Sequence, residues 1–118
     1  MGILAFGSWA REEHGQGSDI DILIVTDDRF TIDREVYRTW DEEPFTWHGH
    51  RVEPHFVHLL RRGDRISGLW AEVAMEGLVF FERGAMVSRR LGEIRRRIMS
   101  GEIVLRSIHG QSYWVEVG

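Results

Sequence analysis

Short apolar runs along this chain alternate with segments in which apolar residues recur every three or four positions. The first pattern is typical of strands and the second of helices that bury one side. The runs predict strands over residues 2–6, 19–25, 45–57, 78–81, 102–106 and 113–117. The helical spacing predicts helices over 9–13, 31–43, 64–76 and 85–99. Together these elements indicate an α+β fold: a mixed sheet with helices packed on it, followed by a C-terminal helix and hairpin.

The sequence also predicts where several of these elements lie in the fold and where the third helix begins and ends. The run over residues 19–25 is apolar on both sides in its second half, which predicts a central strand. The run 78–81 has the same character and predicts a short buried strand. Pro54 lacks a backbone N–H and therefore indicates an edge strand or a strand end. Asp64 is the expected N-cap of the third helix, and Gly77 is expected to close it.

Length and composition narrow the class of protein. With 118 residues the chain is expected to form one domain, a catalytic core over 1–82 with an extension over 83–118. There is no cysteine, which excludes disulfides, thiolate zinc sites and cysteine nucleophiles. No apolar run approaches the roughly 20 residues of a membrane span, and no leader precedes the first strand. The chain is therefore expected to be cytoplasmic and away from membranes.

The net charge of −4 hides a separation of charges along the chain. Residues 11–43 hold 11 acids and 4 arginines, whereas residues 83–106 hold 7 arginines and 2 acids. Such a separation is typical of solvated surfaces, and it also fits a cation-binding edge and an edge that binds an anion or a partner. The arginine side of the helix 85–99 is a solvated surface by default and also the best candidate for docking an acidic partner or a nucleic acid. The mildly acidic average of the whole chain predicts no general affinity for nucleic acid.

Two carboxylates on one predicted strand are the most informative candidates for a functional site. Asp19 and Asp21 are separated by one residue, so they project from the same side of the strand. Ile20 and Ile22 are then expected to point into the core. Two adjacent carboxylates repel each other unless a cation neutralises them, and hard oxygen ligands suit Mg²⁺.

A Gly-Ser turn stands ten residues before these carboxylates. Gly7 and Ser8 follow a strand and open a predicted helix, whose free N–H groups and positive dipole favour a phosphate. Glycine lets that phosphate approach the backbone closely. The turn and the paired acids together predict a site for a metal–triphosphate complex. Either half alone is also typical of ordinary solvated turns and strands.

The sequence "GSWAREEHGQGSDIDILIV" resembles the minimal nucleotidyltransferases of the DNA polymerase β superfamily. Their pattern is a hydrophobic residue, Gly, Ser or Gly, about ten residues, and then acid–hydrophobic–acid–hydrophobic. The resemblance implies that Gly7 and Ser8 hold the nucleotide phosphates and that Asp19 and Asp21 bind two Mg²⁺ ions. It also implies a third acid on a neighbouring strand. The chain departs from the family at two positions: Trp9 stands where the family often has Arg, and Glu12 where it often has Gly. Arg11 is then the remaining cation near the turn, and a weaker phosphate contact is expected.

The third acid is assigned to Glu53, in the segment "RVEPHFVH". Glu53 would complete the metal site and receive the proton of the acceptor hydroxyl. His55 shares its side of the strand and is the alternative base or ligand. His48, His50 and His58 lie close by in sequence, but no second ligand group supports a zinc site, and they are expected to be ordinary polar residues.

Two functions follow from the resemblance. The first is an enzyme that transfers a nucleoside monophosphate, AMP from ATP, to an acceptor hydroxyl, as the antitoxin of a pair with a helical HEPN-type toxin. The second is a catalytically weak antitoxin that neutralises its partner by docking. The sequence alone leaves the acceptor, the nucleotide preference and the oligomeric state open.

Overall fold

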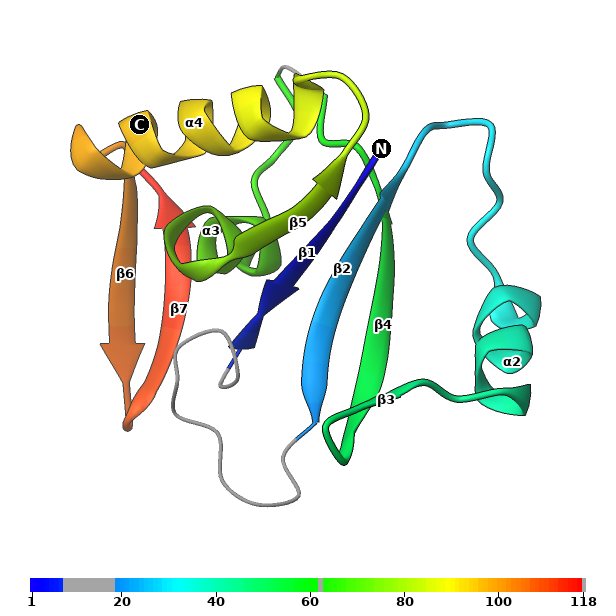
Figure 1. Cartoon of the computed structure of the whole chain (residues 1–118). Helices are drawn as coiled ribbons and strands as arrows, with labels where there is room; N and C mark the ends of the chain where they lie inside the picture. The colour runs from blue at the N-terminus through cyan, green and yellow to red at the C-terminus, as the bar shows by residue number, and fades with distance from the viewer. Residues whose placement is uncertain (8–18, 62, 118) are drawn as a thin grey trace.

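Five strands form one mixed, curled sheet at the centre of the protein (Figure 1). A computed structural model describes residues 1–7, 19–61 and 63–117. The strands lie in the order β3-β4-β2-β1-β5, with bounds β1 (Gly2–Phe6), β2 (Ile20–Thr26), β3 (Thr46–Trp47), β4 (His50–His58) and β5 (Leu78–Glu82). β2 runs parallel to β4, and the other neighbouring strands are antiparallel. The prediction of a central strand over 19–25 is confirmed.

Three helices and a second, two-stranded sheet complete the described part of the chain. They are α2 (Arg34–Glu42), α3 (Gly68–Glu76), α4 (Met86–Met99), β6 (Ile103–Ile108) and β7 (Gln111–Glu116). Figure 1 shows α3 and α4 on one side of the five-stranded sheet and α2 on the other. The fold is thus α+β with a C-terminal helix and hairpin, as the sequence predicted.

The hydrophobic core lies between the sheet and the pair α3 and α4. Leu4, Leu23, Val87 and Leu91 are at most 1% exposed and belong to one cluster. Because this cluster joins strands of the first half to α4 of the second half, the C-terminal segment packs on the same core. The division of the chain at residue 82 stays a prediction.

The two faces of the sheet differ, and we name them by what covers them. The helix-covered face carries Leu23 and Val25 of β2 in the core, and the alternation along the strand places Asp21 on it too. The open face carries Ile20, Ile22 and Ile24. The expectation that Ile20 and Ile22 point into the core holds only in part. Ile20 is 4% exposed, but both isoleucines lie on the face opposite the cluster beneath α3 and α4, whereas Asp21 lies on the face of that cluster.

Two further expectations are corrected by the packing. Ser67 rather than Asp64 caps α3, and its side chain accepts the amide of Trp70 at 3.3 Å. Asp64 instead accepts the amide of Arg61, which closes the preceding loop. The strand over 78–81 is not buried: β5 lies at the sheet edge, and its four apolar residues are 42–59% exposed. Apolar character alone could not reveal that no described element covers it.

The turns and the proline position agree with the sequence. Both hairpins turn at a His-Gly pair with positive φ, 49° and 81° at His48 and Gly49, 50° and 80° at His109 and Gly110. Positive φ at both central residues matches the right-handed twist of hairpin strands. β3 pairs with β4 only at His50 and Arg51, so Pro54 faces no strand on that side. No helix in the described residues is long and apolar enough to span a bilayer.

Candidate nucleotide site

Three strands bring the predicted residues into one row across the sheet. Phe6 at the end of β1 lies opposite Asp21 of β2, and Asp21 lies beside Glu53 of β4. Asp19 stands immediately before β2 and is exposed. All four positions lie at the end of the sheet where β1 ends and where β2 and β4 begin (Figure 1). The fold therefore brings residues that are up to 47 positions apart in the sequence (53 − 6 = 47) to the same end of the sheet.

Gly7 is required at the end of β1 for two independent reasons. Its φ of +77° lies in the left-handed region, which side chains disfavour by about 1–2 kcal/mol. A Cβ atom built on Gly7 would also lie 2.7 Å from Oδ2 of Asp21. A side chain at this position would therefore require the Asp21 carboxylate to move. The role of the turn in binding a phosphate stays a prediction.

Asp21 has a partner that the sequence offered only as an alternative ligand. Nε2 of His55 lies 3.2 Å from Oδ1 of Asp21. The ring of Phe6 meets the His55 ring edge-on, with centroids 5.1 Å apart, and Phe6 is 6% exposed. Phe6 therefore gives the imidazole an apolar support, while the carboxylate fixes its direction. Asp21 and His55 remain solvent-accessible, with side chains 34% and 43% exposed.

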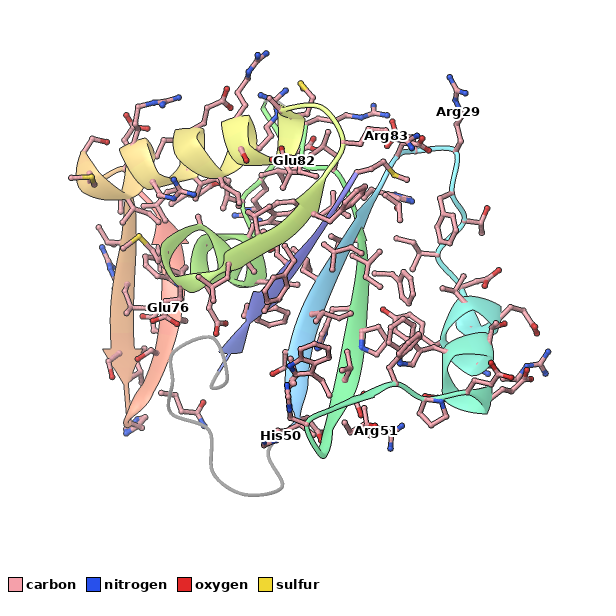
Figure 2. All side chains as sticks on the ribbon, viewed as in Figure 1. Arg29, His50, Arg51, Glu76, Glu82 and Arg83 are labelled. Carbon is pink, nitrogen blue, oxygen red and sulfur yellow. The ribbon has the colours of Figure 1, made fainter. Side chains whose placement is uncertain are left out.

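Glu53 makes a different contact from Asp21. Its Oε1 lies 2.9 Å from Nε of Arg51, and the same guanidinium reaches Oδ1 of Asp41 in α2 at 3.5 Å. Figure 2 labels Arg51 at the end of β4 that carries the site. Arg51 thus balances the charge of Glu53 and connects it to α2 through Asp41. Sequence reasoning missed this contact, although Arg51 and Glu53 are two residues apart on a strand and so share a face.

The carboxylates suit a hard divalent cation by their chemistry, since Asp and Glu oxygens are the ligands that Mg²⁺ prefers. In the described residues, however, no three His, Cys, Asp or Glu side chains come close enough to hold a metal ion together. Mg²⁺ commonly takes only one or two carboxylates and receives its other ligands from phosphates and water. Asp19 and Asp21 match that role. Ser8 and Arg11, the other predicted phosphate ligands, lie outside the described residues.

The histidines near the site behave as polar strand and turn residues. His58 Nε2 lies 2.8 Å from the carbonyl oxygen of Phe30, and His48 occupies a turn beside Trp47. His55 contacts a predicted site residue, Asp21.

A mixed sheet with a glycine turn facing a strand carboxylate is consistent with a nucleotidyltransferase-like class of fold, and comparison with known proteins shows that class. The family model of the nucleotidyltransferase domain matches residues 2–74, and the chain belongs to this family. Among solved structures, a chain from "Crystal structure of the toxin-antitoxin with AMP-PNP" matches with a TM-score of 0.51 and 18% identity, covering 86% of this chain and 77% of that one. At this identity the match speaks for the fold. No curated protein sequence gives a significant match.

Proposed function

We propose that this protein transfers AMP from ATP to a hydroxyl of a partner protein, as the antitoxin of a toxin–antitoxin pair whose toxin is a helical HEPN-type protein. The observation that carries the proposal is the row of Gly7, Asp21 and Glu53 across three strands. Membership of the nucleotidyltransferase family supports a transfer reaction in general. The solved toxin–antitoxin structure with AMP-PNP, which shares the fold, supports the partner and the nucleotide.

Different residues of the row and its neighbours are proposed to bind the phosphates and the metal ion. Gly7 with Ser8 and Arg11 would hold the nucleotide phosphates. Asp19 and Asp21 would hold Mg²⁺, which supplies charge neutralisation for the attacking and leaving oxygens when it is bound. The space next to the Gly7 backbone, which a Cβ atom would fill, lies beside the Asp21 carboxylate. A complex of Mg²⁺ with the nucleotide phosphates needs such a space next to a carboxylate.

The proposed reaction balances without a further co-reactant. The acceptor oxygen attacks the α-phosphorus, the bond to the bridging oxygen of the β-phosphate breaks, and pyrophosphate leaves. The hydroxyl proton passes to a base, for which Glu53 is the proposed residue and His55 the alternative. Arg51 holds Glu53 at 2.9 Å, whereas His55 touches Asp21 at 3.2 Å. The chain's own contribution is to position the groups and to neutralise charge.

Transfer of label from ATP tests this proposal. The protein is incubated with Mg²⁺, ATP labelled at the α-phosphate and a HEPN-type toxin, and labelled toxin is followed on gels. We expect labelling by the wild type and a loss of at least about a hundredfold in Asp21→Asn, which is in the range for removing one transition-state contact. Glu42→Gln is the matched control, because it removes an exposed carboxylate of α2 away from the row.

A second measurement separates binding from chemistry. Mg²⁺ and ATP at 100 times the dissociation constant should stabilise the wild type by about 2.7 kcal/mol in thermal unfolding, and Asp21→Asn should lose this gain. Absence of both transfer and stabilisation, with every divalent cation tried, would overturn the assignment of a nucleotide site.

The second candidate function is a catalytically weak antitoxin that acts by docking. The contact between Arg51 and Glu53 favours it, because a carboxylate already paired with a guanidinium is less available as base or ligand. Trp9 and Glu12, where the family often has Arg and Gly, point the same way. If toxin binding is tight and unchanged in Asp21→Asn while no label is transferred, docking is the function.

A further inference from the structure

The open face of the sheet carries a large apolar surface. Exposed fractions reach 37% at Ile3, 48% at Leu78, 54% at Phe81 and 57% at Trp47. Together with Ile22 and Ile24 these side chains come from four of the five strands. No Asp, Glu or Arg stands among the positions of β1 and β2 that alternate onto this face. Apolar surface of this extent, gathered on one face, marks an interaction site.

A groove crosses this surface. It measures about 320 Å³ and is lined by Ile20, Ile22, Trp47, Val52 and Phe80. The isoleucines and Val52 form the floor, while Trp47 from β3 and Phe80 from β5 stand at its two sides because the sheet is curled. β2 is apolar on both faces, and strands of that kind are normally covered on both. The groove therefore lies on a part of this face that no described helix or strand covers.

The part of the open face that α2 covers shows what kind of element can pack on the rest of it. α2 packs over β4: Tyr37 and Trp40 set their rings against Phe56 at centroid distances of 5.2 and 6.3 Å. The Trp40 Nε1–H donates to the Val52 carbonyl at 3.3 Å, and the Phe56 amide donates to the Tyr37 hydroxyl at 3.1 Å. The remaining strands β2, β1 and β5 span about 10 Å at their usual spacing, which is the width of one helix.

A second copy of the chain does not fit this surface face to face. α2 projects from the same side of the sheet, and the side chains of its Arg38 and Glu35, paired with each other, are 68% and 66% exposed. A second sheet laid on the open face would have to desolvate these charges. A single helix beside α2 avoids that cost, since it can turn its own polar side to water.

Charge beside the groove sets the chemistry of the helix. From the N-cap Asp33 to the C-cap Glu43, α2 carries five carboxylates and two arginines, a net charge of 2 − 5 = −3. A neighbouring helix would be attracted to α2 by basic residues flanking its apolar stripe. The five to seven residues of β1, β2 and β5 extend over roughly 17–23 Å, which about 11–15 helical residues cover.

We infer that this groove binds an amphipathic α-helix of a partner protein, with an apolar stripe toward Ile20 and Ile22 and basic residues toward α2. The helix would complete the second layer of the sheet, in the mode by which apolar grooves take helical segments. The surface lies on the face opposite Asp21 and His55, so the inference stands whether or not the protein transfers AMP.

Peptide binding to the whole protein tests the inference. The probe is a fluorescein-labelled helical peptide of about 15 residues, with leucines forming one stripe and lysines flanking it. Two comparison peptides have the same leucines with flanking glutamates, or the same composition in scrambled order. We expect the lysine peptide to bind at least about ten times more tightly than either in fluorescence anisotropy, with the advantage over the glutamate peptide falling as salt rises.

Variants locate the binding surface. Trp47→Gln and Phe80→Asn, both at exposed positions, should each weaken the lysine peptide about tenfold or more. Leu105→Asn on the C-terminal hairpin is the matched control, 54% exposed in the wild type, and should leave binding unchanged. Circular dichroism and thermal unfolding check that each variant is folded.

Two outcomes would overturn the inference. One is equal affinity for the lysine and the scrambled peptides, or equal affinity in the Trp47→Gln, Phe80→Asn and wild-type proteins. The other is a dimer in light scattering that Phe80→Asn dissociates, which would make a second copy the occupant. Neither outcome depends on ATP, so a failure here is distinct from a failure of the transfer assay.

Discussion

The two faces of the central sheet carry apolar residues to a similar extent but use them differently. On the helix-covered face, Leu23 and Val25 are at most 1% exposed beneath α3 and α4, while the polar pair Asp21, near the start of β2, and His55, in the interior of β4, remains accessible to solvent. On the open face, apolar residues extend to the end of β2 without a carboxylate among them, and several side chains remain about half exposed.

This difference indicates that the two faces of β2 have different roles. β2 alternates between the faces, so each carboxylate of the acid–hydrophobic–acid–hydrophobic pattern has an isoleucine next to it on the other side. The acids serve the proposed nucleotide site, and the isoleucines form the floor of the proposed helix groove. A ligand on one face and a partner on the other would therefore be separated by a single layer of backbone.

Truncation of neighbouring residues on β2 is the strongest test of the comparison between the faces. Leu23→Ala removes a fully buried side chain from the core and should lower the free energy of unfolding by about 2–5 kcal/mol. Ile22→Ala, one position away on the open face, should cost clearly less, because its side chain already retains contact with water. Urea unfolding followed by circular dichroism measures both.

Equal losses in the two variants would contradict the distinction, since they would mean that both faces are equally packed in the isolated protein. If the partner helix is then added, the cost of Ile22→Ala should rise, because its contacts form only in the complex. This second comparison connects the stability of the open face to its occupancy.

The motif and the order of elements were readable from the sequence because they depend on local signals. The apolar run over 19–25 and the helical spacing over 85–99 each specify an element without knowledge of the rest of the chain. Strand pairing places Phe6, the neighbour of Gly7, opposite Asp21 and places Glu53 beside Asp21, whereas their role as a nucleotide site stays a prediction. The family resemblance supplied the pairing that periodicity alone does not contain.

What could not be predicted depends on contacts between distant elements. The apolar run of β5 looks buried, but its exposure depends on which strand ends the sheet and on what covers it. The core face of β2 also could not be chosen, because both sets of alternating residues contain apolar side chains. The cap of α3 moved from Asp64 to Ser67 for a similar reason, since Asp64 closes a loop with Arg61.

Substitution of two glycines with similar backbone angles measures how closely the site is packed. Gly7→Ala and Gly49→Ala both place a side chain in the left-handed region, at φ values of 77° and 81°, which costs about 1–2 kcal/mol. A Cβ at Gly49 meets nothing within 4 Å, whereas a Cβ at Gly7 meets Asp21 Oδ2 at 2.7 Å. Gly7→Ala should therefore be the more destabilising in thermal unfolding, and it alone should weaken ATP binding.

A double variant separates the clash from the backbone strain. Adding Asp21→Ala to Gly7→Ala should recover the part of the loss that exceeds Gly49→Ala, because the opposing carboxylate is gone. No recovery would show that the excess cost arises from backbone conformation and not from the close approach to Asp21.

The smallest expected effect concerns the end of β5, where the open edge strand is tied to the helix layer. The carboxylate of Glu82 accepts the backbone amide of Ser88 at 2.8 Å and its hydroxyl at 2.5 Å. α4 begins at Ala85 without a side-chain cap of its own, so Glu82 caps it from the preceding strand. The Ser88 hydroxyl and then its amide hold the pKa of Glu82 below the ordinary value of 4.5.

Glu82→Gln should lower the free energy of unfolding by about 0.5–1 kcal/mol at neutral pH, as the loss of a helix cap does. Because the pKa of Glu82 is lower in the folded state than in the unfolded chain, its contribution is present above the ordinary pKa and disappears as the pH falls through the folded value. The difference between wild type and Glu82→Gln should therefore vanish in acid. A difference that persists unchanged below the folded pKa would mean that Glu82 supports α4 by packing and not through its charge.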